Sequence, residues 1–180
     1  VENKKYEIAI WLGAILGMRV GEIQALVWSN VKLDTNWILI RSNYCRKEGV
    51  FKSYPKGKKW MDLKIPPELS NKLIDLKRKS KGVFVAGRNN GTLPLNYYSY
   101  SPQLKRYCEQ ANVPIINTHG LRHSAARLYI EHGASREDLQ RLFEHSALQV
   151  TEKYIHDRDY RKGRIAKIAS NLRVFPENVP

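Results

Sequence analysis

Acidic side chains are scarce in this sequence. Its 180 residues include 31 Lys and Arg but only 17 Asp and Glu, which gives a formal net charge of +14 and an isoelectric point near 9.8. A chain this basic points to a polyanionic partner, either a nucleic acid or an acidic membrane surface.

Cysteine and long hydrophobic runs are also nearly absent. The two cysteines, Cys45 and Cys108, have neither the spacing of metal ligands nor a disulfide framework around them, which favours a reduced, cytosolic compartment. The longest apolar run, Ile8 to Leu16, is too short to span a bilayer. No signal peptide, internal repeat or low-complexity segment is recognisable. We therefore expect a single domain that does not span a membrane.

Residues 3–28 predict two helices with a break between them. Apolar residues recur at three- and four-residue spacing from Ile8, and Gly17 ends the first helix. Arg19 lies in the elbow before the second helix, three residues from Glu22, which is close enough to hold a guanidinium in a fixed pose. A surface arginine at a turn is the simpler interpretation of this residue.

The hydrophobic period changes over residues 37–65, where the sequence predicts a three-stranded antiparallel meander. Trp37–Ile40 has strand character, turn residues follow at 47–49 and 55–57, and a strand over 59–65 completes the sheet. The second turn carries three lysines: Lys56, Lys58 and Lys59. Charge protects a sheet edge from aggregation, but lysines gathered at one turn also suit a finger that lies against a phosphate backbone.

Most of the remaining sequence is helical in pattern. Helices are predicted over residues 68–79, 97–108 and 158–172. The stretch from Thr118 to Ile155 predicts a packed helical pair, because Gly133 marks a stop and Ser135 with Asp138 forms an N-cap signal for the second helix.

Histidines within this helical pair allow two kinds of chemistry. His119 and His123 are four residues apart, a spacing that suits two zinc ligands on one helical face, with His145 as a third. However, no acidic residue lies between the pair, and the neighbouring Arg122 would repel a cation. The alternative is that His119 and Arg122 act on one oxyanion, which Tyr154 attacks while nearby cations stabilise its phenolate.

Together these motifs resemble the catalytic domain of the tyrosine recombinases, the phage integrase family. The resemblance covers nearly all of the chain and rests on segments that occur in the family's order: 17–23, 56–69, 119–124 and 144–154. It implies an α+β, mainly α fold, a helical catalytic domain with a small three-stranded antiparallel sheet. It also implies an enzyme that breaks and rejoins DNA to integrate or recombine a phage or mobile element.

The resemblance assigns the central step to three residues. Tyr154 matches the nucleophile that attacks the scissile phosphate, forming a 3′-phosphotyrosyl bond and freeing a 5′-hydroxyl. Arg19 and Arg122 match the arginines that hydrogen-bond the non-bridging oxygens, a task that suits the planar guanidinium. Because the phosphodiester energy is kept in the protein–DNA bond, and fixed cations stabilise the phosphorane, we expect neither metal nor cofactor.

Three more residues match the family's catalytic set. His119 matches the group proposed to accept the tyrosine proton, and His145 matches a further donor to the phosphate. Lys56 matches the hairpin lysine that protonates the leaving 5′-oxygen, and we prefer it to Lys58 for its distance to the Pro-Pro-Glu-Leu segment. Glu144 departs from the family's usual glycine and places a carboxylate beside His145, which either points away or raises the pKa of that histidine.

The implied partners are double-stranded DNA, further copies of the chain in a tetrameric synapse, and accessory DNA-bending proteins, all in the cytoplasm at the nucleoid. Family members carry an N-terminal core-binding domain, and many carry an arm-binding domain. Because neither precedes residues 1–180, we expect an excised catalytic domain that binds DNA weakly and with steep salt dependence. The C-terminal helix and tail, 158–180, are expected to dock either on a neighbouring protomer, our hypothesis, or on their own domain.

Two alternatives share part of this pattern. A type IB topoisomerase performs the same chemistry on one duplex, but such enzymes usually carry lysine where this chain has His119. A non-catalytic DNA-binding module would need the basic hairpin and the charge, but not a tyrosine together with two arginines. The sequence therefore favours a site-specific recombinase.

Overall fold

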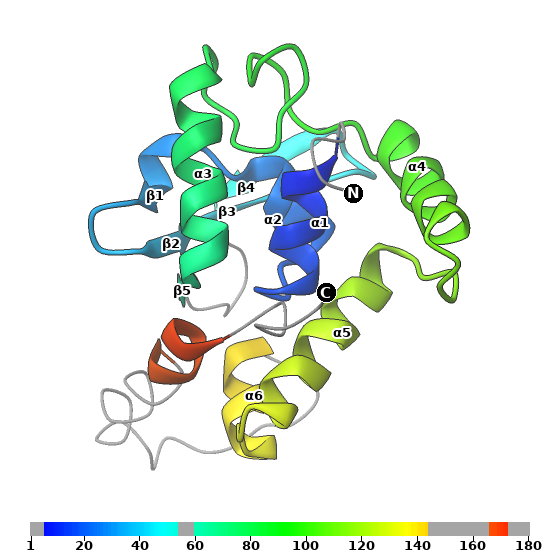
Figure 1. Cartoon of the computed structure of the whole chain (residues 1–180). Coiled ribbons are helices and arrows are strands. Elements are labelled where there is room, and N and C mark those ends of the chain that lie inside the picture. Colours follow the sequence, from blue (N-terminus) through cyan, green and yellow to red (C-terminus); the bar gives the residue numbers. More distant parts are fainter. Residues whose placement is uncertain (1–5, 54–59, 144–165, 173–180) are drawn as a thin grey trace.

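The computed structural model describes residues 6–53, 60–143 and 166–172, and it shows a mainly helical fold with small antiparallel sheets (Figure 1). The labelled helices are α1 (Glu7–Ala14), α2 (Val20–Ala25), α3 (Pro67–Lys79), α4 (Tyr97–Gln110), α5 (Thr118–Glu131) and α6 (Arg136–Phe143), with a 3-10 turn at Trp28–Asn30. The strands are β1 (Val31–Lys32), β2 (Trp37–Ile40), β3 (Ser42–Cys45), β4 (Val50–Ser53) and β5 (Met61–Lys64). The predicted fold class is confirmed.

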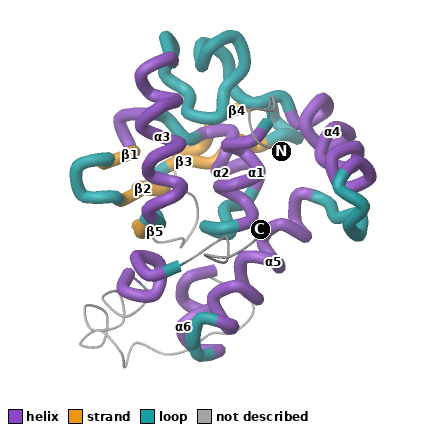
Figure 2. The backbone as a smooth tube through the Cα atoms, viewed as in Figure 1, coloured by secondary structure: helices purple, strands orange, loops and turns teal. Residues whose placement is uncertain are grey.

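Helix α1 lies at the centre of the fold. Its sequence is apolar on nearly every side, with Ala9 and Leu12 fully buried, so α2, α3 and α5 all pack against it. Gly13 allows α5 to approach closely, because a Cβ atom at this position would lie 3.1 Å from Cδ1 of Leu121. Strands β1, β2 and β5 lie on one side of α1, and α4 and α5 lie on the other (Figure 2).

The predicted three-stranded antiparallel sheet is present, but its connectivity differs from a meander. Its strand order is β1-β2-β5, with Ile38 opposite Leu63 and Ile40 opposite Met61. Ile38, Ile40 and Leu63 are buried, and these inward-facing apolar side chains attach the sheet to the core. The segment between β2 and β5 leaves this sheet.

Strands β3 and β4 form a separate hairpin, and this is where the meander prediction is wrong. The predicted turn at 47–49 does connect two antiparallel strands, with Cys45 opposite Val50. Neither strand has a fully buried residue, so no alternating apolar face holds the hairpin on the core sheet. Instead β3 packs on α2, where Gly21 leaves room for Asn43 and the backbone of Tyr44. The predicted turn at 55–57 lies outside the described residues.

The helical predictions are largely confirmed. Gly133, with φ of 87°, separates α5 from α6, and the Ser135 hydroxyl accepts a 3.1 Å hydrogen bond from the Asp138 amide. The Asp138 carboxylate in turn accepts from the Ser135 amide at 3.0 Å, which completes the capping box predicted from sequence. No helix within the described residues is both long and apolar enough to cross a membrane.

Part of the C-terminal segment packs on its own domain. Residues 166–171 are helical, and Ala169 and Leu172 are fully buried in the same core cluster as α1 and α6. Nearby, Ile168 is half-buried, whereas Ile165 and Val174 lie outside the described residues. The described part therefore docks in cis, and contact of the remaining tail with a neighbouring protomer stays a prediction.

Candidate active site

Arg19 occupies the elbow between α1 and α2, as the sequence predicts. Its backbone amide donates a 2.8 Å hydrogen bond to Glu22 Oε2, and its Nη1 donates to Oε1 at 3.0 Å. Glu22 is only 1% exposed, whereas the Arg19 side chain is 32% exposed. One buried carboxylate therefore holds both the backbone and the guanidinium of Arg19, so the cation has a fixed direction while its outer part reaches solvent.

Arg122 projects from α5 into the interior and is 4% exposed. Its Nη1 donates to the carbonyl oxygen of Gly17 at 2.5 Å, and its Nη2 donates to the carbonyl oxygen of Phe143. Its guanidinium also lies 4.8 Å from the centre of the Phe143 ring. Contacts to two carbonyl groups and one aromatic face fix the plane of this buried cation.

The two arginines meet at the Phe143 carbonyl. Nη2 of Arg19 donates to this oxygen at 3.3 Å, and Nη2 of Arg122 donates to the same atom. The three residues come from the start of α2, from α5 and from α6, so the tertiary fold, and not local sequence, brings the cations together. With Glu22 beside them, the pair keeps one positive charge in excess, which suits an anion with several oxygens. We call Arg19 and Arg122 the arginine pair.

Gly17 makes this junction possible. It adopts a φ of 64°, which lets the chain leave α1 and bring its carbonyl to Arg122. A Cβ atom at Gly17 would lie 2.1 Å from Cε1 of Phe143, so a side chain would push away the residue whose carbonyl joins the arginine pair. The sequence predicted a helix end at this glycine but not its packing role.

His119 lies in the first turn of α5, three residues before Arg122. Its side chain is exposed, and its ring is edge-on to that of His123, with the ring centres 4.7 Å apart. The side chain of Asn117 caps the helix by accepting hydrogen bonds from the amides of His119 at 3.0 Å and Gly120 at 2.8 Å. Helix α5 thus carries an exposed imidazole and a buried guanidinium near one end.

Helix α4 and the β3–β4 hairpin contact the same end of α5. Tyr97 interacts with Ser101, Arg46 and Thr118, and the Arg46 guanidinium lies 3.7 Å from the centre of the Tyr97 ring. The hydrogen bond to Ser101, followed by the influence of Arg46, lowers the pKa of the Tyr97 phenol against the opposing effect of its burial. The start of α5 is therefore connected to two neighbouring elements.

Several predicted site residues lie outside the part of the chain that the structure describes. They are Lys56, His145 and Tyr154, together with Lys58, Lys59 and Glu144, so their assignments stay predictions. Of the predicted set, the structure brings Arg19 and Arg122 together and puts His119 on the helix of Arg122.

Three groups that build the site were not anticipated from sequence: the carbonyls of Gly17 and Phe143, and the Asn117 cap. Asn117 immediately precedes a helical pattern and could have been recognised as an N-cap. Backbone carbonyls leave no sequence signal. Among the described residues, no three His, Cys, Asp or Glu side chains come together as a metal site would require.

Comparison with known proteins identifies the family. The sequence profile of the phage integrase family matches residues 3–161. This chain belongs to the phage integrase family. Tyrosine recombinase XerD of Pseudomonas aeruginosa is 26% identical over 148 residues, which cover 78% of this chain and 45% of that protein. Tyrosine recombinase XerC of Bifidobacterium longum is 41% identical over 51 residues, which cover 28% of this chain and 14% of that protein.

Solved structures agree on the fold of this family member. The integrase of transposon Tn1549, solved in complex with a circular intermediate DNA, superposes with a TM-score of 0.67 at 18% identity, covering 79% of this chain and 51% of that one. At this identity the similarity shows a shared fold. The chain spans less than half the length of the curated relatives cited above.

Proposed function

We propose that this chain is the catalytic domain of a site-specific DNA recombinase that cuts and rejoins double-stranded DNA through a covalent phosphotyrosyl intermediate. The convergence of Arg19 and Arg122 on one point is the observation that best supports the proposal. Two guanidinium groups that meet at a single acceptor oxygen form a geometry suited to the non-bridging oxygens of a phosphodiester. Family membership supports the same reaction class.

In the proposed reaction, the Tyr154 oxygen attacks the scissile phosphorus and the bond to the 5′-oxygen breaks. The tyrosine proton passes to His119, and Lys56 gives a proton to the leaving 5′-oxygen. Arg19 and Arg122 stabilise the negative charge on the non-bridging oxygens, since fixed cations act most strongly where charge increases in the transition state. His145 adds a further hydrogen bond to the phosphate.

Rejoining reverses these steps with a different 5′-hydroxyl as the attacking group. One phosphotyrosyl ester replaces one phosphodiester and is later replaced by another, so the reaction consumes neither ATP nor any other source of energy. The Glu22 carboxylate assists indirectly, because it fixes the direction of Arg19 before DNA binds.

The proposed partners are double-stranded DNA and further copies of the chain. A net charge of +14 favours the phosphate backbone, and the expected binding is weak and strongly salt-dependent for this segment alone. A tetramer that joins two duplexes, accessory DNA-bending proteins and action in the cytoplasm at the nucleoid belong to the same proposal.

A suicide substrate tests the reaction directly. A duplex from the attachment region of the encoding element, nicked close to the cleavage site, traps the covalent intermediate because the short 5′-hydroxyl strand diffuses away. We expect a protease-sensitive protein–DNA adduct on a denaturing gel, formed equally with and without EDTA and absent in Tyr154→Phe.

Other outcomes would contradict the proposal. Cleavage that EDTA abolishes, with no adduct, would indicate a metal-dependent hydrolase. DNA binding without any adduct, in a chain joined to a core-binding domain, would indicate a non-catalytic DNA-binding module. An adduct accompanied by relaxation of supercoiled DNA without strand exchange would indicate a topoisomerase.

A further inference from the structure

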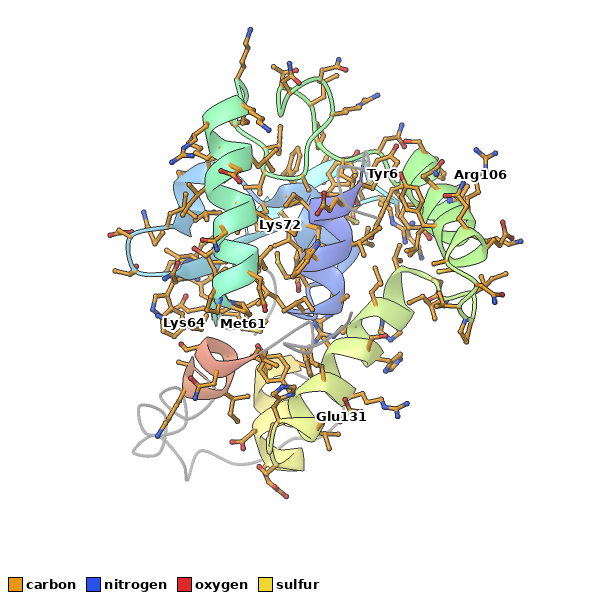
Figure 3. The ribbon with its side chains drawn as sticks, viewed as in Figure 1. Tyr6, Met61, Lys64, Lys72, Arg106 and Glu131 are labelled. Atoms are coloured by element: carbon orange, nitrogen blue, oxygen red, sulfur yellow. The ribbon has the colours of Figure 1, made fainter. Side chains whose placement is uncertain are left out.

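Strands β2 and β5 present a partly exposed outer face. Ile38, Ile40 and Leu63 face the core, so the alternate positions face outward. The outward positions are Trp37, Leu39 and Arg41 on or beside β2, and Trp60, Asp62 and Lys64 on or beside β5. Figure 3 labels Met61 and Lys64 on β5, at the edge of the molecule.

This face carries two pairs of a cation with a tryptophan. Lys64 lies opposite Trp37, and its Nζ is 5.3 Å from the centre of that indole. At the other end of the strand pair, Arg41 lies with its guanidinium carbon 5.0 Å from the centre of the Trp60 ring. Both distances are within the range of a cation–π contact.

Arg41 contacts three acceptor groups. Its Nη2 donates to Asp62 Oδ1 at 2.7 Å, and its Nη1 donates to the carbonyl oxygens of Ile40 at 3.2 Å and Met61 at 3.1 Å. The charge of Arg41 is therefore matched by Asp62, and its planar group is oriented by three acceptors. The main effect of this arrangement is to support the indole of Trp60 and not to attract a phosphate.

Trp60 is unusual among the tryptophans of this chain. Trp11 and Trp28 are 7% exposed, Trp37 is half-buried, and Trp60 is 66% exposed. The side chains of its supports are far less exposed, at 26% for Arg41 and 25% for Asp62. A large, oriented indole left in water forgoes much of the stabilisation that burial would give it, which indicates a ligand for the exposed face.

The position of this pair relates it to the arginine pair. Arg41 and Glu22 lie close together where α2 packs beside β2, next to Met18. Glu22 is the residue that orients Arg19. Arg41 and Trp60 therefore lie near the residue that orients Arg19.

We propose that Trp60, supported by Arg41, packs against a deoxyribose or an unstacked base of the bound DNA next to the cleaved phosphate. The proposal rests on the proposed function, since it assumes that DNA occupies the arginine pair. Flat aromatic side chains beside cationic grooves bind the sugar and base surfaces of nucleic acids with little dependence on sequence. The strongly basic charge of the chain favours DNA over a second protein as the occupant of this surface.

Equilibrium binding to the nicked duplex, measured by fluorescence anisotropy in the Tyr154→Phe background over a series of salt concentrations, tests this role. Trp60→Leu should weaken binding about tenfold at every salt concentration. The slope of log K against log salt should not change, because a neutral side chain releases no counterions from DNA, whereas loss of one phosphate-binding cation would reduce it by about 0.9. Trp60→Phe should keep most of the affinity.

A matched control separates a specific contact of Trp60 with DNA from non-specific binding by any exposed aromatic side chain. Tyr98 is 78% exposed on α4, on the opposite side of the molecule from β5 in Figure 1, so Tyr98→Leu also removes an exposed aromatic ring. We expect Tyr98→Leu to bind DNA like the parent chain. As an independent measurement, DNA should reduce acrylamide quenching of the indole fluorescence in the parent chain but not in Trp60→Leu.

The outcomes distinguish this inference from the proposed function. Equal affinity of Trp60→Leu and the parent, a reduced salt slope, or the same loss in Tyr98→Leu would overturn the role of Trp60 and leave the recombinase proposal standing. A change in self-association on sedimentation, without a change in DNA affinity, would assign the surface to a second copy of the chain. If the parent chain joined to a core-binding domain bound no DNA, both proposals would be wrong.

Discussion

Arg19 and Arg41 each form an ion pair with a carboxylate, but the two pairs have different surroundings. The partner of Arg19 is Glu22, which is 1% exposed, and Arg19 also contacts the carbonyl of Phe143, a residue far away in the sequence. The partner of Arg41 is Asp62, whose side chain is 25% exposed, and its other acceptors belong to the adjoining ends of β2 and β5. Arg19 is thus oriented by a local, buried carboxylate together with one distant carbonyl, and Arg41 by sheet register.

This difference indicates what each arginine can do. A buried carboxylate cannot exchange its partner for water without a large loss of free energy, so Arg19 keeps its direction when the site is empty. An ion pair that water reaches contributes little stability and can rearrange. We infer that the arginine pair is preorganised, whereas the Arg41–Trp60 pair adapts to what binds it.

Removing Arg122 should have the largest effect. Arg122→Ala leaves two carbonyl groups without their buried donor, and we expect a loss of about 3 kcal/mol in the free energy of unfolding. We also expect covalent adduct formation to slow about 10³-fold, as for the loss of a donor to a transition-state oxyanion. Urea unfolding and suicide-substrate kinetics measure the two effects. Arg122→Lys retains the charge and should recover stability more than rate, because an ammonium cannot contact both carbonyls in the same plane.

Gly17→Ala should be the next most damaging change. The positive φ alone disfavours alanine by about 1–2 kcal/mol, and the clash with Phe143 should raise the total loss of stability to about 3 kcal/mol. Gly133→Ala is the matched control, since Gly133 also has positive φ but a Cβ atom added there would meet nothing within 4 Å. Equal unfolding free energies for the two variants would show that Phe143 simply moves aside, and that the arginine pair is less tightly packed than we infer.

Neutralising the two carboxylates compares the ion pairs directly. Glu22→Gln should lower stability by about 2 kcal/mol and slow adduct formation about tenfold at saturating DNA, because Arg19 loses its fixed direction. Asp62→Asn should change stability by less than about 1 kcal/mol and alter DNA affinity without changing the rate at saturation. If both substitutions produced the same rate effect, the distinction between a preorganised and an adaptable arginine would fail.

Replacing Tyr100 should have the smallest effect. It separates the contribution of a buried ring from that of a hydrogen bond made by its hydroxyl. Its side chain is fully buried, and its hydroxyl has no hydrogen-bond partner within the described residues. Tyr100→Phe should therefore leave stability at pH 7 unchanged or increase it by about 1 kcal/mol. A loss of more than about 1 kcal/mol would show that the hydroxyl is satisfied in solution, by water or by another group.

The same variant has a defined pH dependence. Burial raises the pKa of the Tyr100 phenol, so the native state keeps this proton above the pH at which an unfolded tyrosine, with a pKa of about 10, releases it. The native state then binds more protons than the unfolded state, and stability falls as the pH rises above about 10. Tyr100→Phe should reduce this alkaline fall, as measured by urea unfolding between pH 8 and 11.

The sequence predicted the local features of the site better than its assembly. Periodicity and capping residues located most of the described helices, the Gly17 and Gly133 helix ends and the Ser135–Asp138 capping box, since these depend on neighbouring residues. The Arg19–Glu22 contact was also predicted, because the residues are three apart. The role of the Phe143 carbonyl was not, because a backbone acceptor leaves no trace in residue identity.

The sheet illustrates the same limit. Strand character over residues 37–40 and 61–64 was visible, but the sequence could not show that β2 pairs with β5 while β3 and β4 form a hairpin. Pairing depended on which strands carry inward apolar residues and on the space that Gly21 leaves beside α2. The arrangement of Arg41 beside Trp60 follows from that pairing and was therefore also missed.

The shared acceptor at Phe143 has a consequence for communication within the molecule. Phe143 is the last residue of α6, and the chain continues from it toward His145 and Tyr154. Because both arginines bind its carbonyl, the position of this helix end and the affinity of the arginines for an anion are energetically coupled. This coupling is reciprocal. A change in the position of the helix end alters the free energy of phosphate binding, and phosphate binding alters the free energy of that position by the same amount. Under the proposed function, a DNA phosphate would then influence the segment that carries the proposed nucleophile, Tyr154, as well as being attacked by it.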